Sequence, residues 1–172
     1  MAFADYQKVI DDFKNSELKE IEKYIAKNNI KAEKVGDKVF VEIQSEGTGP
    51  VADSGLLVGI RYTGYNLEGK FFDSNVDSTK QVNKHGMELF YFVAKREGSV
   101  VGMLEGITRF RQGSKGRIFI PSTLGYGPPG NPPIKPNESL IFDIEVVEVK
   151  PLPEQPAGPN PMMPGGNPNG GQ

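Results

Sequence analysis

Apolar residues in the first 34 positions recur at the spacing of amphipathic α-helices. They fall into two groups, the first with Tyr6, Val9, Ile10 and Phe13 and the second with Leu18, Ile21, Tyr24 and Ile25. Asn15 and Ser16 interrupt the pattern, and Ser16 is a good N-cap for a second helix. Asn28 and Asn29 are a plausible stop. We therefore predict a helical extension over residues 1–34 that docks on the following domain or on a second copy of the chain.

From about residue 35 the apolar residues alternate with polar ones at the period of β-strands. This pattern predicts strands over residues 38–43, 56–65, 89–93, 116–120 and 139–150. Turn signals rich in glycine separate them, and only residues 103–110 have the apolar spacing of a helix. Many strands with one short helix predict an α+β domain over residues 35–150, in which an antiparallel sheet wraps around the helix.

Two stretches lack the pattern of a buried core. Residues 75–88 are polar and contain His85, so we interpret them as an exposed loop. Residues 151–172 hold seven prolines and five glycines among 22 residues. Such a tail buries too little apolar surface to offset its ordering entropy, and we predict that it is disordered. The alternative is a polyproline-type ligand for a partner domain.

Composition and charge remove several classes of function. The net charge is −2, which gives no reason to expect a nucleic acid partner. No apolar run approaches the ~20 residues that cross a bilayer. The absence of cysteine excludes disulfides and thiol catalysis. No signal peptide is visible, so we expect a cytoplasmic protein if Met1 is the native start, and an exported or periplasmic one if a signal was removed.

The motifs of common enzymes are poorly supported. The run Gly125-Tyr126-Gly127-Pro128-Pro129-Gly130 fits a dinucleotide-binding string, but its prolines deny amide donors where a helix would have to begin. A catalytic triad would have to use His85, which we interpret as a surface residue without a second metal ligand nearby. Asp143 and Glu145 alternate along one strand face and are interpreted as solvated. We expect no metal site and no cofactor.

Aromatic residues at the ends of strands remain to be explained. Tyr62 precedes Thr63-Gly64, Phe72 abuts Asp73, and Tyr126 lies on the glycine- and proline-rich loop. Several such rings at loop junctions suggest an apolar pocket, since a buried phenol needs a partner for its hydroxyl.

Five sequence blocks carry a family resemblance. They are Arg61-Tyr62-Thr63-Gly64, Gly69-Lys70-Phe71-Phe72-Asp73-Ser74, Val100-Val101-Gly102-Met103-Leu104-Glu105-Gly106, Ile120-Pro121-Ser122 through Tyr126-Gly127, and Leu140-Ile141-Phe142-Asp143. In this order and spacing, over roughly residues 50–150, they resemble the FKBP family of peptidyl-prolyl cis-trans isomerases. The helical segment that precedes them is similar to the extensions of bacterial members.

The resemblance implies a twisted antiparallel sheet curled around one short helix, with the active pocket between them. It assigns catalytic roles to Tyr62, Asp73, Tyr126 and Phe142, and substrate binding to Phe72, Phe90, Val100, Met103 and Ile134. Met103 would form the floor, where many family members carry tryptophan. The loop of residues 75–88 then becomes an insertion, since the family usually has about half this length between Phe72-Asp73 and Phe90.

The resemblance also implies the partners. We expect proline-containing polypeptides as substrates, a role in assisting protein folding, and weakened binding of the family's macrolide inhibitors because Met103 is a softer floor. We expect a monomer, with a dimer through residues 1–34 as the alternative. A binding module that recognises proline without turnover is the competing interpretation, and a holdase-type chaperone is a third.

Overall fold

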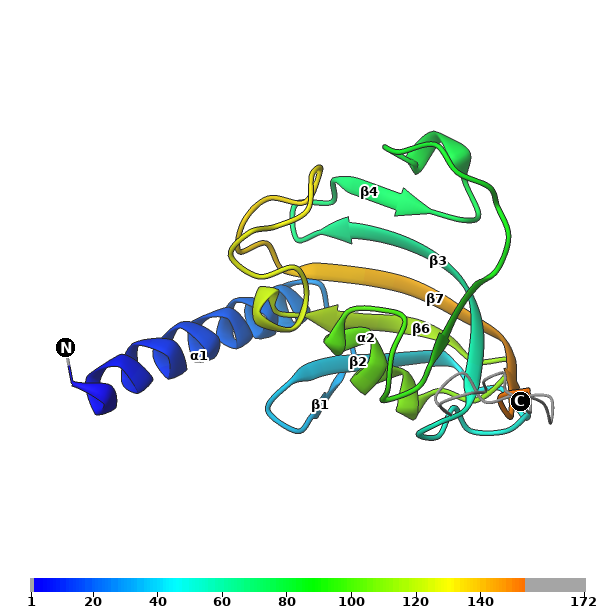
Figure 1. Ribbon diagram of the computed structural model, residues 1–172, viewed down its shortest axis with the longest axis horizontal. Coiled ribbons are helices and arrows are strands. Elements are labelled where there is room, and N and C mark those ends of the chain that lie inside the picture. The colour runs from blue at the N-terminus through cyan, green and yellow to red at the C-terminus, as the bar shows by residue number, and fades with distance from the viewer. Residues whose placement is uncertain (1, 154–172) are drawn as a thin grey trace, which may run out of the picture.

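A seven-stranded antiparallel sheet forms the body of the protein in the computed structural model, which describes residues 2–153 (Figure 1). The strands are β1 (Glu33–Val35), β2 (Val39–Ser45), β3 (Leu57–Asn66), β4 (Phe71–Ser74), β5 (Phe90–Val93), β6 (Lys115–Ile120) and β7 (Leu140–Lys150). Their order is β1-β2-β6-β7-β3-β4, and β5 also pairs with β3. The tail beyond residue 153, predicted to be disordered, lies outside the described residues.

The outer edge of β3 is shared by two short strands. Residues 57–60 of β3 pair with β5, and residues 63–65 pair with β4. The chain between β4 and β5 therefore leaves the sheet at one point along this edge and returns beside it. That connection is the loop of residues 75–88, so the pairing places the insertion next to the middle of β3.

All five predicted strands are confirmed, with small shifts at their ends, and two strands were missed. β1 has three residues and β4 has four, which is too short for an alternating pattern to show. β4 also ends in Asp73 and Ser74, polar residues that resemble a loop in the sequence. The fold is α+β, as predicted.

One short helix lies against the sheet. α2 (Val101–Gly106) continues as a 3₁₀ turn over Ile107–Arg109, so the predicted helix begins two residues earlier than expected. A Cβ on Gly102 would lie 2.4 Å from a side-chain carbon of Ile120, which shows how closely α2 approaches β6. The main core fills the space between them. Its fully buried side chains include Ile60, Met103, Ile107, Phe110, Ile118 and Ile120.

The N-terminal extension is a single helix, α1 (Phe3–Lys27), and the predicted break at Asn15-Ser16 is wrong. The Ser16 hydroxyl donates a hydrogen bond to the Phe13 carbonyl at 2.8 Å, one turn back, instead of capping a new helix. The stop is confirmed, because Asn28 donates its side-chain amide to the Tyr24 carbonyl and Asn29 adopts a φ of 54°.

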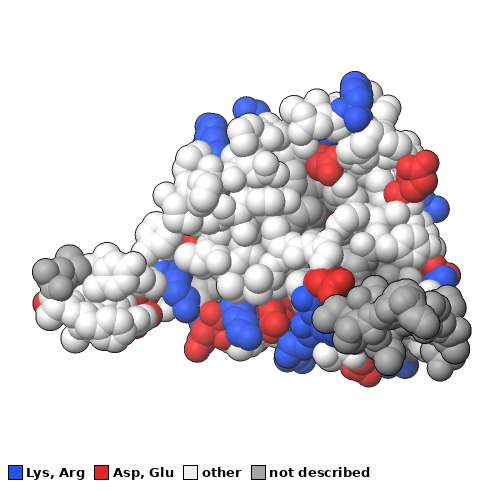
Figure 2. All heavy atoms as spheres, viewed as in Figure 1, with Lys and Arg blue, Asp and Glu red and all other residues white. Residues whose placement is uncertain are grey.

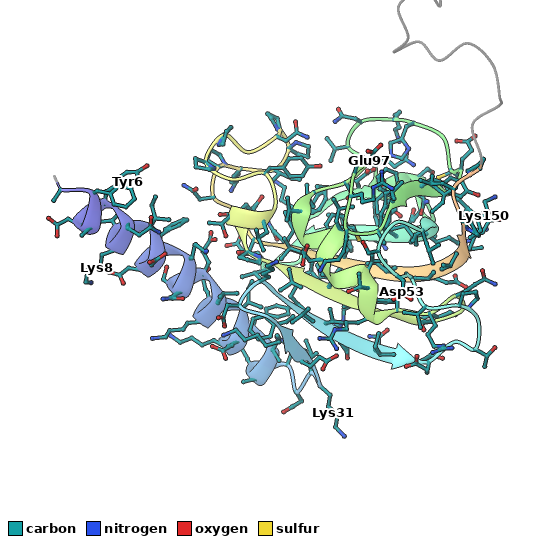
Figure 3. All side chains as sticks on the ribbon, turned by 60° about the horizontal axis from the view of Figure 1, so that its bottom comes forward. Tyr6, Lys8, Lys31, Asp53, Glu97 and Lys150 are labelled. Carbon is teal, nitrogen blue, oxygen red and sulfur yellow. The ribbon has the colours of Figure 1, made fainter. Side chains whose placement is uncertain are left out.

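The two halves of α1 differ in their surroundings. Leu18 and Ile21 in the second half are buried against Phe40, Phe119 and Ile141 on the sheet, in a cluster separate from the main core. The first half extends beyond the sheet, and Tyr6 and Lys8 mark this free part in Figure 3. Its apolar side chains are exposed, with Phe3 at 80% and Tyr6 at 55%. Docking within the chain therefore accounts for the second apolar group only.

Candidate active site

A hollow of about 270 Å³ opens between α2 and the sheet. Figure 2 shows the hollowed face, which is mostly uncharged around the opening. All nine residues predicted for the site line this hollow, namely Tyr62, Phe72, Asp73, Phe90, Val100, Met103, Tyr126, Ile134 and Phe142. They come from β3, β4, β5 and β7, from the start of α2, and from the loop between β6 and β7.

Aromatic rings packed edge to face form the wall on the sheet side. The centroids of Phe72 and Phe142 lie 5.5 Å apart at an interplanar angle of 87°. Tyr62 contacts both Phe90 and Phe142, with centroids 5.7 and 6.1 Å away. A Cβ on Gly64 would lie 2.5 Å from Phe72, so the glycine at this strand position leaves room for the ring. Such contacts fix the ring orientations and give the pocket a defined apolar shape.

Met103 lines the hollow, and its role as the floor stays a prediction. It lies in the first turns of α2 and is 1% exposed. Val100 is the N-cap of the same helix, in an extended conformation, and its carbonyl accepts hydrogen bonds from the Met103 and Leu104 amides at 3.0 and 3.2 Å. The packing of α2 on β6 therefore positions both residues along the hollow.

One corner of the hollow is polar. The Tyr62 hydroxyl donates a hydrogen bond to Asp73 Oδ2 at 2.5 Å, and the Ser74 amide donates to Asp73 Oδ1 at 2.8 Å. Burial, and secondly the hydrogen bond to Asp73, raise the pKa of Tyr62 well above its usual value. Tyr62 therefore stays neutral and acts as a donor throughout the physiological pH range.

The glycine- and proline-rich loop forms the opposite side. A 3₁₀ turn over Ser122–Leu124 precedes Tyr126, which is 36% exposed at the mouth of the hollow. Gly127 follows with a φ of 60°, a conformation that favours glycine, and its amide donates to the Ser122 carbonyl at 2.9 Å. Ile134 is buried at 5% exposure on the same loop. The loop thus presents a phenol to solvent and an aliphatic side chain to the interior.

The loop of residues 75–88 contributes two pocket residues that the sequence did not reveal. Asn83 and His85 line the same hollow, and His85 Nε2 lies 2.5 Å from Asp73 Oδ1. His85 is exposed, as predicted, yet it contacts the polar corner of the site. No sequence signal marked it, because its position depends on how the loop folds back.

Two buried amides hold this loop, so the prediction of an exposed loop is wrong at these positions. Asn75 accepts a hydrogen bond from the Tyr62 amide at 2.7 Å and donates to the Ile60 and Glu88 carbonyls, both at 3.0 Å. Gln81 donates to the Ser74 carbonyl at 2.8 Å and accepts from the His85 amide at 3.1 Å. These bonds satisfy polar groups that would otherwise be costly to bury.

Within residues 2–153, no three His, Cys, Asp or Glu side chains are grouped so that they could hold a metal ion. No helix in the same range is long and apolar enough to cross a membrane. The arrangement offers an apolar, aromatic cavity with a donor and a carboxylate at one corner. It suits a compact apolar ring with polar groups on either side.

A comparison with protein families identifies the family of this chain. The family model for FKBP-type peptidyl-prolyl cis-trans isomerases matches residues 49–147, more than half of the chain. The chain belongs to this family. Every residue that lines the hollow of this FKBP lies within the matched range.

Individual relatives agree with this assignment. The FKBP-type isomerase FkpA of Escherichia coli K12 is 30% identical over 80% of this chain and 47% of its own length. FK506-binding protein 4 of Emericella nidulans is 38% identical over 65% of this chain and 22% of its own. The chain thus spans about half, or less, of the curated relatives it matches.

Solved structures share the architecture. The crystal structure of E. coli FkpA superposes with a TM-score of 0.64 at 29% identity, covering 87% of this chain and 65% of that chain. A peptidyl-prolyl isomerase from Pseudomonas syringae pv. tomato gives a TM-score of 0.61 at 26% identity, over 79% of this chain and 95% of that one.

Proposed function

We propose that this FKBP catalyses cis-trans isomerisation of X-Pro peptide bonds in polypeptide substrates. The observation that carries the proposal is the hollow itself, walled by Phe72, Phe90 and Phe142 with a polar corner at Tyr62 and Asp73. Its size and apolar lining suit a proline ring, and the polar groups at its edge suit the peptide groups on either side of that ring.

The proposed reaction needs no nucleophile. Rotation about a peptide bond faces a barrier of ~18–20 kcal/mol because planarity carries the resonance. At X-Pro bonds the two planar isomers are close in energy and interchange in roughly tens to hundreds of seconds. A site that binds the twisted amide better than either planar form therefore lowers the barrier without breaking a covalent bond.

An apolar pocket favours the twisted amide. The planar amide is charge-separated and loses more hydration on entering the pocket than the twisted one does. We propose that Phe72, Phe90, Met103 and Phe142 provide this environment and grip the proline ring. In this account the Val100 amide and the Tyr126 hydroxyl contact substrate carbonyls and hold the twist. Asp73, through Tyr62, orients polar groups without transferring a proton.

A protease-free isomerisation assay with succinylated Ala-Ala-Pro-Phe peptide tests the proposal. Full-length protein at micromolar concentration should raise the rate at least tenfold above the uncatalysed rate. Tyr6→Ala, on the free half of α1, is a matched control that should retain the whole activity. Tight peptide binding without acceleration would contradict the proposal and would indicate a binding module without turnover. The Met103 floor and the loop of residues 75–88 are the two features that motivate this alternative.

Inhibitor binding gives an independent measure of the pocket. Several relatives are named FK506-binding proteins, and we propose that this pocket also accepts such a macrolide. The flexible Met103 thioether gives a less shaped floor than an indole does, so affinity should be lower than for a tryptophan floor. Met103→Trp should tighten binding in a fluorescence competition assay, and an unchanged or weaker affinity would contradict this role for the floor.

We further propose that the isomerase acts as a folding helper. The exposed apolar side chains on the first half of α1, with Phe3 at 80% exposure, support a role in contacting other chains. Holdase activity and dimerisation through residues 1–34 are both measurable against a chain that begins near Val35. Equal aggregation suppression and equal sedimentation mass for the two forms would count against both roles.

A further inference from the structure

The contact between His85 and Asp73 adds a titratable group to the pocket. His85 lies in the loop of residues 75–88 and lines the hollow together with Asn83. Its Nε2 atom is 2.5 Å from Asp73 Oδ1, on the carboxylate whose other oxygen accepts the Tyr62 hydroxyl. An imidazole, a carboxylate and a phenol thus form a continuous chain of contacts along one side of the pocket.

Both ring nitrogens of His85 face acceptors. Nδ1 lies 2.7 Å from the Gly86 carbonyl oxygen, while Nε2 faces the Asp73 carboxylate. A neutral imidazole has only one N–H, whereas an imidazolium donates from both nitrogens. Neither the carbonyl nor the carboxylate can donate in return. The geometry therefore matches the protonated ring, and a neutral His85 would leave one of these contacts without a proton.

We propose that His85 sets the charge preference of the pocket for the side chain that precedes the substrate proline, by neutralising Asp73 when its imidazole is protonated. This inference rests on the proposed isomerase function. With imidazolium present, the polar corner has no net charge and tolerates an acidic neighbour of the proline. With neutral His85, the corner carries the Asp73 charge alone and disfavours such a neighbour.

The groups around His85 favour its protonated form. Asp73 faces it from β4, Tyr62 lies behind that carboxylate on β3, Glu88 follows on the same loop, and Tyr126 faces Tyr62 across the pocket. The hydrogen bond to Asp73, and then that to the Gly86 carbonyl, raise the pKa of His85 above its usual 6.5. The charged contact is thus complete below pH 6.5 and is lost as the pH rises through the folded-state value.

The expected size of the effect follows from Coulomb's law. Two unit charges about 6 Å apart, in an effective dielectric of roughly 40 to 80, change a rate or binding constant by about threefold to tenfold. An acidic and a basic side chain before proline should respond in opposite directions. The ratio of their kcat/KM values is therefore the sensitive quantity, because effects common to both peptides cancel.

The charge state of His85 can be measured directly, because the chain contains one histidine. In untagged full-length protein, the imidazole Cε1–H signal in NMR belongs to His85 and reports its pKa. We expect a value above 6.5 that falls in Asp73→Asn. A value at or below 6.5 that Asp73→Asn leaves unchanged would overturn the pairing on which the proposal depends.

The preference itself is tested with succinylated Ala-Glu-Pro-Phe and Ala-Lys-Pro-Phe peptides in the protease-free assay, from pH 6 to pH 8.5. In the wild-type protein the Glu/Lys ratio of kcat/KM should fall about threefold to tenfold as the pH rises. His85→Gln keeps an N–H donor but no charge, so its ratio should stay at the wild-type high-pH value. His85→Arg keeps a positive charge and should hold the low-pH value. A flat wild-type ratio, or the same pH profile in His85→Gln, would overturn the proposal.

Failure of the proposed function would look different. If the wild-type protein accelerates neither peptide at any pH, the isomerase assignment fails, while the NMR titration still tests the contact. Peptide affinities from chemical-shift changes then replace kcat/KM, and an unchanged Glu/Lys affinity ratio across this pH range would overturn the charge preference. The His85 side chain is exposed, so both variants should fold. Equal thermal unfolding of the variants and the wild-type protein would show that folding is not the cause of any change.

Discussion

The pocket has a sheet side, formed by β3, β4, β5 and β7, and a loop side, formed by the loop of residues 75–88 and the loop between β6 and β7. Different interactions hold the two sides in place. On the sheet side, the Phe72, Phe90 and Phe142 rings sit on paired strands and pack against one another. On the loop side, hydrogen bonds from polar side chains hold the chain, such as those of Asn75 and Gln81 in the loop of residues 75–88. The difference teaches that the paired strands carry both the aromatic wall and the Tyr62–Asp73 corner, whereas the loop adds His85 to that corner through a fold that depends on side-chain hydrogen bonds.

Removing a ring from the sheet side should have the largest effect. Phe142 is 8% exposed and contacts both Tyr62 and Phe72. Phe142→Ala leaves a cavity in the pocket wall and should lower the free energy of unfolding by about 3 kcal/mol, with loss of nearly all isomerase activity. Phe142→Leu fills part of the space and should cost less. If chemical denaturation shows that Phe142→Ala lowers the free energy of unfolding by less than about 1 kcal/mol, the sheet side is not part of the core.

A buried contact from α1 to the loop side should come next. The Glu17 carboxylate accepts hydrogen bonds from the Ser122 hydroxyl and from the Thr123 amide, at the start of the turn that leads to Tyr126. Glu17→Ala leaves both donors unpaired and should cost about 1–3 kcal/mol. Because the turn precedes Tyr126, turnover should fall as well.

Glu17→Gln provides the control for this contact, since its amide oxygen still accepts a hydrogen bond. It should lose less stability than Glu17→Ala and retain more activity. Equal effects of the two substitutions would contradict the importance of the hydrogen bonds and point to the charge or the volume of the side chain.

The smallest effect is expected at the pocket mouth. Tyr126 is 36% exposed, so Tyr126→Phe removes a hydroxyl without opening the core. We expect unchanged stability and a loss of kcat/KM of about threefold to tenfold, equal to one modest hydrogen bond, because the apolar pocket remains. If folded Tyr126→Phe lost as much kcat/KM as Phe142→Ala, the apolar environment would not be the main source of catalysis.

The difference between the sheet side and the loop side also explains which parts of the site could be predicted from the sequence. Strand alternation placed Phe90 and Phe142 on strands, and the family resemblance named nine residues, including these two, that the structure brings to one hollow. Tyr62, Phe90 and Phe142 lie on strands whose alternation the sequence shows, whereas Phe72 and Asp73 lie on β4. β4 was missed because four residues ending in Asp73 and Ser74 show no alternation.

The loop side resisted prediction for a physical reason. His85 reaches Asp73 because Asn75 and Gln81 fold the loop back through side-chain bonds to backbone groups 5 to 15 residues away. No periodic pattern encodes such contacts. The break predicted at Ser16 was wrong for a similar reason. The Ser16 hydroxyl can cap a new helix or donate a hydrogen bond one turn back, and the sequence does not decide between the two. The packing of Leu18 and Ile21 on the sheet favours a continuous helix.

Exchange NMR tests the central claim most directly, because it measures the interconversion of cis and trans X-Pro peptide at equilibrium, without a protease or a refolding protein. With catalytic amounts of full-length protein, we expect exchange cross-peaks within a mixing time of about a second, whereas the uncatalysed reaction needs roughly tens of seconds or more. Phe142→Ala should abolish these peaks, and Tyr6→Ala should leave them unchanged. Bound peptide signals without exchange in the wild-type protein would contradict the account.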